Sequence, residues 1–361
     1  MKVAVFGATG VVGLSAIHHF VSQPETEVIA VSRRDLDVAN VTHVPLDLRD
    51  TAACADVLGS APFAGTTHVV FAALQEATDL AAGWRDPELM RLNLHMFENA
   101  LLPLSRRPNA SLRHVSLLQG AKAYGFHLGR TPLPAKESAA RDDHQNFYFL
   151  QEDSLRSLSQ ECGWGWTILR PQVVFGGSIG SPMNLIPAIG VYAALERAAG
   201  RALSWPGGPP SVQEAVDADL LARVLGWAAT APAAAGQIFN VTNGDVYCWR
   251  DVWPAVADMF AMDCGEPVPA RLAEAMPPRS GEWEAVVDRH RLVAPRDMAT
   301  YVGGSWAYAD ILFRPGGARS APVLLSTVKL RQAGFGECID TEQMLRRWIG
   351  RLQRAGLLPR A

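Results

Sequence analysis

The chain has 361 residues, of which 48% are hydrophobic and 19% charged, and its formal net charge at pH 7 is −3. That length supports one large core or two modest ones, and the near-neutral charge gives no hint of a nucleic-acid or membrane surface. The five cysteines form no CxxC pair, so we expect reduced thiols, no disulfide framework and no metal site.

The start of the chain lacks the features of a signal peptide, because Met1 leads almost directly into a β-branched run without a basic segment. The longest apolar stretch, at residues 185–195, is too short and too interrupted by glycine to span a bilayer. We therefore expect a soluble, cytoplasmic protein that has neither a membrane nor a nucleic acid as its partner.

The first element predicted is a strand at residues 2–6 (KVAVF), which ends at Gly7-Ala8-Thr9-Gly10-Val11-Val12-Gly13. Apolar residues then recur at helical spacing. A strand, a glycine turn and a helix in this order are typical of a dinucleotide-binding fold. The glycines permit a tight turn and close approach of the pyrophosphate, and the helix N-terminus favours its negative charge. The glycine pattern alone is a weak signal, but its position between a strand and a helix makes it strong.

A second strand is predicted at residues 27–31 (EVIAV), and it is followed by Ser32-Arg33-Arg34. An acidic residue at this point would accept the ribose hydroxyls of NAD. Two arginines suit the 2′-phosphate of NADP instead, through charge-assisted contacts. The sequence therefore predicts NADP(H) as the cofactor, with a solvated surface pair of arginines as the alternative.

Further strands are expected at residues 43–46, 68–72, 113–118 and 166–170. The first leads into Asp47-Leu48, from which a carboxylate and the backbone could meet the adenine. The second ends in small residues, including Ala72, where the nicotinamide half should pass. Alternating strands and helices predict an α/β fold of the Rossmann type, with a doubly wound parallel sheet and a smaller C-terminal lobe.

Residues 126–145 are polar and aperiodic and contain proline, so we expect a loop over the site there.

After Pro171 the alternation of strands and helices is less regular, although a helix is expected at residues 215–229 and a further strand at residues 237–241. We predict an NADP-binding domain at residues 1–175, to which residues 215–245 return, and a mainly substrate-binding lobe at residues 176–361 that is interleaved with it.

Tyr148 is the candidate catalytic residue. It lies at the start of a helix that we expect to run from Asn146 or Phe147 to Cys162. A tyrosine that acts as an acid needs a nearby cation, because its reference pKa is about 10. Many nicotinamide-dependent reductases have a lysine one helical turn later, where this chain has Glu152. A carboxylate there cannot lower the pKa of the phenol. We expect Glu152 and Asp153 to stabilise the first turn of the helix through its dipole.

Motifs along the whole chain resemble the extended short-chain dehydrogenase/reductases, and more specifically their progesterone 5β-reductase / iridoid synthase-like branch. NFYFLQED around Tyr148 is similar to that branch's NFYYxxED, and VSLLQGAKAYG around Lys122 is similar to its VSLQTGxKHYxG. Residues 178–184 resemble its SPxSxMN. FNVTNGDV, with Trp249 and Trp253 after it, resembles its FNxxNGDVFxWKxLW.

This resemblance implies NADPH-dependent reduction of an activated carbon–carbon double bond in a 1,4-enone or enal. Hydride would pass to the β-carbon, and Tyr148 and Lys122 would stabilise the negative charge that develops on the carbonyl oxygen. The two residues lie on different elements, so the fold must bring them together. The residues expected to bind the cofactor are Gly7, Thr9, Gly10, Val11, Val12, Gly13, Ser32, Arg33, Arg34, Asp47, Leu48, Ala72, Pro171, Val173, Val174, Ser181 and Met183.

Departures from the branch's motifs leave the substrate open. Phe149 replaces the second tyrosine, the run Lys122-Ala123-Tyr124 lacks a histidine, and small residues occupy the expected substrate loop near Gly176. Reduction of a ketone or aldehyde by the same extended group is the alternative activity, and a non-catalytic NADP-binding sensor is a third. The missing lysine at Glu152 favours alkene reduction, in which the tyrosine need only donate a hydrogen bond. The oligomeric state is also open, with a homodimer among the options.

Overall fold

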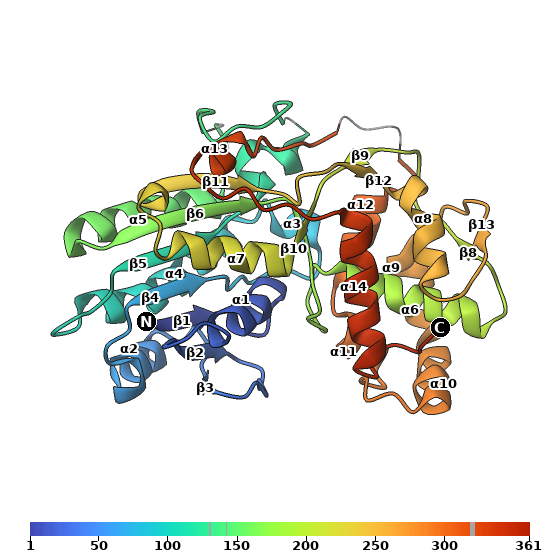
Figure 1. Cartoon of the computed structure of the whole chain (residues 1–361), viewed down its shortest axis with the longest axis horizontal. Coiled ribbons are helices and arrows are strands. Elements are labelled where there is room, and N and C mark those ends of the chain that lie inside the picture. The colour runs from blue at the N-terminus through green and yellow to red at the C-terminus, as the bar shows by residue number, and fades with distance from the viewer. Residues whose placement is uncertain (130, 142, 318–321) are drawn as a thin grey trace. The chain divides into compact units, whose positions relative to one another are not determined.

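The computed structural model describes residues 1–129, 131–141, 143–317 and 322–361 (Figure 1). The chain forms two compact units. The first comprises Met1–Gln172, Ala218–Thr242 and Leu324–Glu337, and the second comprises Val173–Asp217, Asn243–Val323 and Cys338–Ala361. The return of Leu324–Glu337 to the first unit was not predicted. That the cofactor binds to one unit and the substrate to the other stays a prediction.

A parallel seven-stranded sheet forms the centre of the first unit, with the order β11-β6-β5-β4-β1-β2-β3. The strand order reverses between β1 and β4, which is where doubly wound sheets bind dinucleotides. The predicted Rossmann fold is confirmed. The strands are β1 Lys2–Phe6, β2 Glu27–Ser32, β3 Val41–Pro45, β4 His68–Phe71, β5 His114–Leu118, β6 Gly165–Pro171 and β11 Gln237–Val241.

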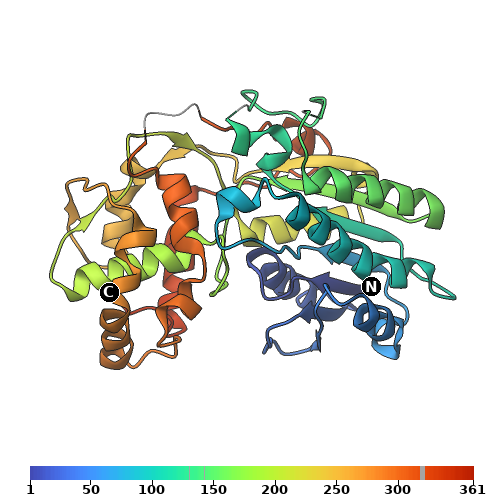
Figure 2. The same ribbon diagram turned by 180° about the vertical axis from the view of Figure 1, so that it is seen from behind.

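Helices cover both faces of this sheet, because its strands are apolar on both sides and each side must be shielded from water. Helices α1 and α7 contact each other on one face, and α2, α4 and α5 lie on the other (Figures 1 and 2). Their bounds are α1 Val11–Val21, α2 Thr51–Gly59, α4 Pro87–Arg106, α5 Phe147–Cys162 and α7 Ala218–Ala228. Shorter elements of the unit are α3 Leu80–Gly83, α13 Val328–Gln332 and the 3₁₀ turns η1 Ala61–Phe63, η2 Ala121–Tyr124, η3 Phe126–Leu128 and η4 Pro232–Ala234.

The second unit packs its helices around α6, Leu185–Ala198, which is buried along most of its length. Trp205, Trp249, Trp253 and Phe313 form an aromatic cluster within it. Its other helices are α8 Trp249–Asp258, α9 Leu272–Ala275, η5 Pro277–Arg279, α10 Ser280–His290, α11 Met298–Val302, α12 Ser305–Phe313 and α14 Thr341–Arg354. Its short strands are β7 Val173–Phe175, β8 Leu203–Ser204, β9 Val212–Gln213, β10 Ala215–Asp217, β12 Tyr247–Cys248 and β13 Cys264–Gly265.

Two sequence predictions need correction. The helix expected at residues 215–229 begins only at Ala218, because Ala215–Asp217 forms β10 and pairs in parallel with β7. The segment 126–145, expected to be an irregular loop, contains η3 and a β-bridge between Ala135 and Leu325, while its residues 130 and 142 lie outside the described part. Among the described residues, no helix combines the length and apolar character needed to cross a membrane.

Candidate active site

The glycine turn after β1 has the close contacts that a dinucleotide-binding turn requires. Gly7 has φ +81°, and a Cβ added to it would lie 2.7 Å from the carbonyl carbon of Ala72, which directly follows β4. A Cβ on Gly13 would lie 2.2 Å from the Gly7 oxygen. Glycine is therefore required at both positions, to let β1 approach β4 and to let α1 pack on the turn.

Helix α1 begins at Val11, and Val12 and Gly13 complete its first turn. Its N-cap, Gly10, has an extended backbone and makes no side-chain cap hydrogen bond. The first amides of a helix have no carbonyl partner within the helix, and its dipole favours negative charge there. The turn and the helix start together fit the pyrophosphate of a dinucleotide.

The two arginines after β2 differ in what they contact. The guanidinium of Arg34 donates hydrogen bonds to the Thr9 hydroxyl at 3.3 Å and to the Thr9 carbonyl at 2.9 Å. The Ser32 hydroxyl donates to the Arg34 carbonyl at 2.8 Å, so this segment is tied to the glycine turn. Arg33 lies exposed beside it. Arg34 therefore braces the turn, and the Arg33 side chain extends into solvent.

Asp47 and Leu48, which were expected to contact adenine, make hydrogen bonds to other residues of the protein. The Asp47 carboxylate accepts hydrogen bonds from the Arg49 guanidinium, which lowers the pKa of Asp47 to about 2. The carbonyl of Leu48 accepts a hydrogen bond of 2.8 Å from the Asn99 side chain. A contact of Asp47 or Leu48 with adenine stays a prediction.

The remaining cofactor residues predicted fall in different units. Pro171 ends β6 in the first unit, whereas Val173 and Val174 form part of β7 in the second. Ser181 and Met183 lie in the loop before α6, also in the second unit, and the Ser181 carbonyl accepts a hydrogen bond of 2.7 Å from the Ser305 hydroxyl.

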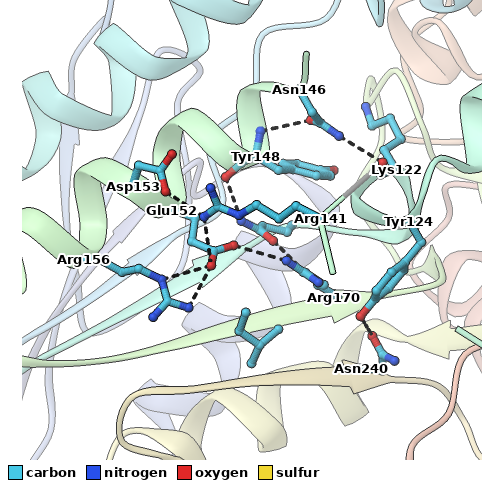
Figure 3. Close-up of polar contacts among 12 residues, drawn as sticks. Lys122, Tyr124, Arg141, Asn146, Tyr148, Glu152, Asp153, Arg156, Arg170 and Asn240 are labelled. Atoms are coloured by element: carbon cyan, nitrogen blue, oxygen red, sulfur yellow. Dashed lines mark hydrogen bonds and ion pairs between the residues drawn. The ribbon is translucent and has the colours of Figure 1, made fainter. Parts of the chain in front are cut away.

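The fold brings Lys122 and Tyr148 together (Figure 3). Lys122 lies in η2, directly after β5, and its ammonium is 5.5 Å from the centroid of the Tyr148 ring. Asn146, the N-cap of α5, joins the two elements. Its side-chain nitrogen donates to the Lys122 carbonyl, and its side-chain oxygen accepts from the backbone amide of Tyr148, both at 3.0 Å. The same cap fixes where α5 begins, and with it the direction of the phenol.

The surroundings of this pair are mostly apolar and aromatic. The Lys122 ammonium lies 4.7 Å from the centroid of the Trp84 ring and 5.4 Å from that of Phe147. Burial lowers the pKa of Lys122 below its usual value, and the Glu76 carboxylate opposes that shift. The Tyr148 hydroxyl lies 3.3 Å from where a Cβ on Gly120 would be, so the backbone at Gly120 approaches the phenol closely.

Glu152, which replaces the usual lysine, is a buried carboxylate surrounded by three arginines (Figure 3). It pairs with Arg141 at 3.1 Å, Arg156 at 2.8 Å and Arg170 at 3.2 Å. The prediction that Glu152 and Asp153 stabilise the first turn of α5 is wrong, because both lie in the second turn. Glu152 instead balances the charge of Arg170, which is itself buried.

Arg170 connects this ion cluster to the backbone of Tyr148. Its Nε donates to the Gln119 side-chain oxygen at 2.8 Å, and the Gln119 amide donates to the Tyr148 carbonyl at 2.9 Å. The Arg170 guanidinium also lies 5.0 Å from the centroid of the Tyr124 ring. The Tyr124 hydroxyl donates to the Asn240 side chain at 2.6 Å, and burial raises the pKa of Tyr124.

Two sets of contacts hold the segment before α5 in place, one to α5 and one to β11. Arg141 pairs with Asp153 at 2.7 Å as well as with Glu152. The side-chain nitrogen of Asn240 donates a hydrogen bond of 3.1 Å to the Ala135 carbonyl. Asn240 comes from the FNVTNGDV motif, so this part of the motif holds the segment to β11.

Sequence reasoning missed Glu76 and Trp84, which complete the surroundings of Lys122. The Lys122 ammonium donates to a Glu76 carboxylate oxygen at 3.4 Å, and the Trp84 indole N–H lies 3.4 Å from the same oxygen. Both residues lie between β4 and α4, in a stretch without a recognisable motif. Gln119, which donates to the Tyr148 carbonyl, and Arg170, which donates to Gln119, were also missed, because only the fold shows that these residues meet.

Comparisons with known proteins show the family to which the chain belongs. Residues 3–296 match the family described as a PRISE-like Rossmann-fold domain. The chain is 31% identical to an (S)-8-oxocitronellyl enol synthase of Antirrhinum majus, covering 98% of this chain and 92% of that protein. It is 30% identical to an enzyme of the same name from Catharanthus roseus, covering 92% and 85%. A short chain dehydrogenase of Penicillium aethiopicum is 29% identical, covering 81% and 80%.

Solved structures support the fold alone. A UDP-glucose 4-epimerase of Thermotoga maritima aligns with a TM-score of 0.69 at 15% identity, covering 98% of this chain and 99% of that one. The epimerase of Thermus thermophilus aligns with a TM-score of 0.66 at 18% identity, covering 98% and 100%.

The parallel sheet, the glycine turn and these relatives define an enzyme of the short-chain dehydrogenase/reductase superfamily. The chain belongs to the PRISE-like Rossmann-fold family, and the resemblance to the progesterone 5β-reductase / iridoid synthase-like branch is confirmed.

Proposed function

We propose that the protein is an NADPH-dependent reductase of activated carbon–carbon double bonds in enones or enals. The observation that carries this proposal is the placement of the Lys122 ammonium 5.5 Å from the centroid of the Tyr148 ring, although the two residues come from different elements. Relatives named 8-oxocitronellyl enol synthase at about one-third identity support the same reaction class, since an enol is the product expected when an enal is reduced at its β-carbon.

In the proposed reaction, the hydride that adds to the β-carbon would come from NADPH bound at the glycine turn. Negative charge then develops on the carbonyl oxygen. The Tyr148 hydroxyl donates a hydrogen bond to that oxygen, and the charge of Lys122 stabilises it electrostatically. Both groups are largely buried, and a charge acts more strongly in such surroundings than in water. Because the proton that completes the product can reach carbon from water, Tyr148 need not be deprotonated.

The replacement of lysine by Glu152 also supports this chemistry over ketone reduction. Ketone reduction requires the tyrosine to transfer its proton, and a cation on the same helix face assists that step. Here that face carries a carboxylate whose charge is balanced by arginines. Lys122 is the cation on the other side of the phenol.

The choice of reaction is tested by incubating the purified protein with NADPH and a small enone. We expect NADPH oxidation and a saturated ketone as the product. An allylic alcohol as the product would identify a carbonyl reductase instead. Tight NADP binding without turnover on a broad panel of enones and carbonyl compounds would identify a sensor.

The NADP preference is assigned to Arg33, since Arg34 is engaged with the glycine turn. We expect Arg33→Ser to weaken NADPH binding about 10- to 100-fold, the effect of losing one charged hydrogen bond of about 1.5–3 kcal/mol. NADH binding should change little, because NADH lacks the 2′-phosphate. Titration of the intrinsic protein fluorescence with each cofactor measures both affinities.

The matched control is Arg34→Ser, which removes the brace on Thr9 and should weaken both cofactors to a similar degree. An Arg33→Ser variant that keeps its full preference for NADPH would contradict the assignment.

A further inference from the structure

The carboxylate of Glu76 lies beside Lys122 in a part of the site to which the family motifs assign nothing. Its side chain is only 4% exposed, and that of Lys122 is 11% exposed. The Lys122 ammonium donates to Glu76 at 3.4 Å while the rings of Trp84, Phe147 and Tyr148 lie within 5.5 Å of it. The lysine is therefore enclosed by three aromatic rings and one carboxylate.

The segment that carries Glu76 is fixed to the helices around the site. The backbone amide of Gln75 donates to the side-chain oxygen of Asn93 at 2.9 Å. The side-chain nitrogen of Asn93 donates back to the backbone carbonyl of Gln75 at 3.0 Å. The side chain of Gln151 donates to the Asn93 carbonyl at 2.9 Å. Asn93 belongs to α4 and Gln151 to α5, so the segment that carries Glu76 is bound to α4, which in turn is bound to the helix that carries Tyr148.

A buried ammonium requires compensation, because leaving water disfavours the charged form of lysine and aromatic rings offset this only in part. Burial lowers the pKa of Lys122, and the charge and hydrogen bond of Glu76 raise it. The other titratable groups around Lys122 are Tyr148, Tyr124 in its own turn and His144, which contacts Asn146. Among them, Glu76 is the group whose charge acts on Lys122.

We propose that Glu76 is a positioning residue of the reaction: its carboxylate keeps the Lys122 ammonium charged and holds it at the Tyr148 ring, where the substrate oxygen would bind. An ammonium has three N–H donors, so a hydrogen bond to Glu76 leaves others that can point to a substrate oxygen. The distance of 3.4 Å between the Lys122 nitrogen and the Glu76 carboxylate oxygen exceeds that of a tight charged hydrogen bond. The ammonium can therefore shift towards a substrate oxygen on which negative charge develops. This inference rests on the proposed role of Lys122.

The direct test follows the protonation of Lys122 by nitrogen NMR of protein that carries ¹⁵N-lysine, with the resonance assigned by its loss in Lys122→Met. Glu76→Gln keeps the size of the side chain and removes its charge. We expect the titration of Lys122 to move to lower pH by about 1–3 units, the effect of losing an opposite charge at this range. Glu76→Asp should restore most of the shift. Glu88→Gln, an exposed glutamate that pairs with Arg91, is the control and should leave the titration unchanged.

The pH profile of kcat/KM gives the second readout. Charged Lys122 predominates below its pKa, so activity that needs the ammonium falls as pH rises through that value. In Glu76→Gln this fall should occur at lower pH, and Glu76→Asp should bring it back towards that of the wild type. An Lys122 resonance that titrates identically in Glu76→Gln and wild type would overturn the inference. Absence of enone turnover in the wild-type protein would instead refute the proposed function, while the Lys122 titration would still decide the role of Glu76.

Discussion

Replacing Tyr148 with phenylalanine is expected to lower kcat/KM for enone reduction about 100- to 1000-fold, the usual effect of removing one donor to a developing oxyanion. The substitution deletes only the hydroxyl, and the ring that packs against Phe147 and lies below the Lys122 ammonium is kept. NADPH binding and thermal stability should therefore change little. Steady-state kinetics with one enone, together with a cofactor titration, measure the two effects separately.

Tyr124→Phe is the matched control for this prediction. It removes a second phenol hydroxyl from the same unit, one that already donates to Asn240. We expect a loss of about 1 kcal/mol in the free energy of unfolding and nearly unchanged kcat/KM. If Tyr148→Phe kept kcat/KM within about threefold of the wild type, a different group would have to stabilise the oxyanion.

Glu152→Lys should destabilise the protein strongly, although it restores the lysine found one turn after the tyrosine in many reductases. The substitution would place a buried cation among Arg141, Arg156 and Arg170 and leave the buried Arg170 unpaired. Removing one partner of a buried ion pair typically costs about 3–5 kcal/mol, and the added positive charge increases that cost. Urea denaturation of the purified variant measures the loss.

Asp153→Lys provides the comparison on the next residue of α5. Asp153 is 61% exposed and pairs with Arg141 near the surface, so its reversal should cost about 1 kcal/mol or less. Equal stability of Glu152→Lys and wild type would mean that the arginines do not depend on Glu152, and would remove the physical reason for the missing lysine.

The central sheet was predictable because each of its strands is a short apolar run with a clear end. Residues 2–6 and 237–241 were predicted with the bounds observed, and the edge strand β3 was displaced by about two residues. The edge strand is half exposed, so its apolar pattern is weaker than that of the buried strands. The start of α7 was placed too early because Ala215–Asp217 is fixed by pairing with β7, a contact that local helical spacing does not contain.

The candidate site was predictable only where a motif carries it. Tyr148, Lys122 and the glycine turn were found from sequence patterns, whereas Glu76 and Trp84 lie in a stretch whose residue types are ordinary for a loop. The role assigned to Glu152 failed for a related reason. Its arginine partners lie 11 residues before it, one turn after it and at the end of β6, so no local pattern reveals the cluster.

The first unit is built from three separate stretches of chain, and this has a consequence for synthesis on the ribosome. Residues 1–172 contain six of its seven sheet strands, but β11 follows at Gln237–Val241 and the Leu324–Glu337 stretch comes later still. Ala135 pairs with Leu325, and the Ser326 amide donates to the Ala135 carbonyl at 2.8 Å. The segment beside Lys122 and Tyr148 therefore gains these backbone partners only after Leu325 and Ser326 have been synthesised. A nascent chain can assemble the glycine turn after β1 early, whereas the segment before α5 acquires its contacts with Leu325 and Ser326 much later.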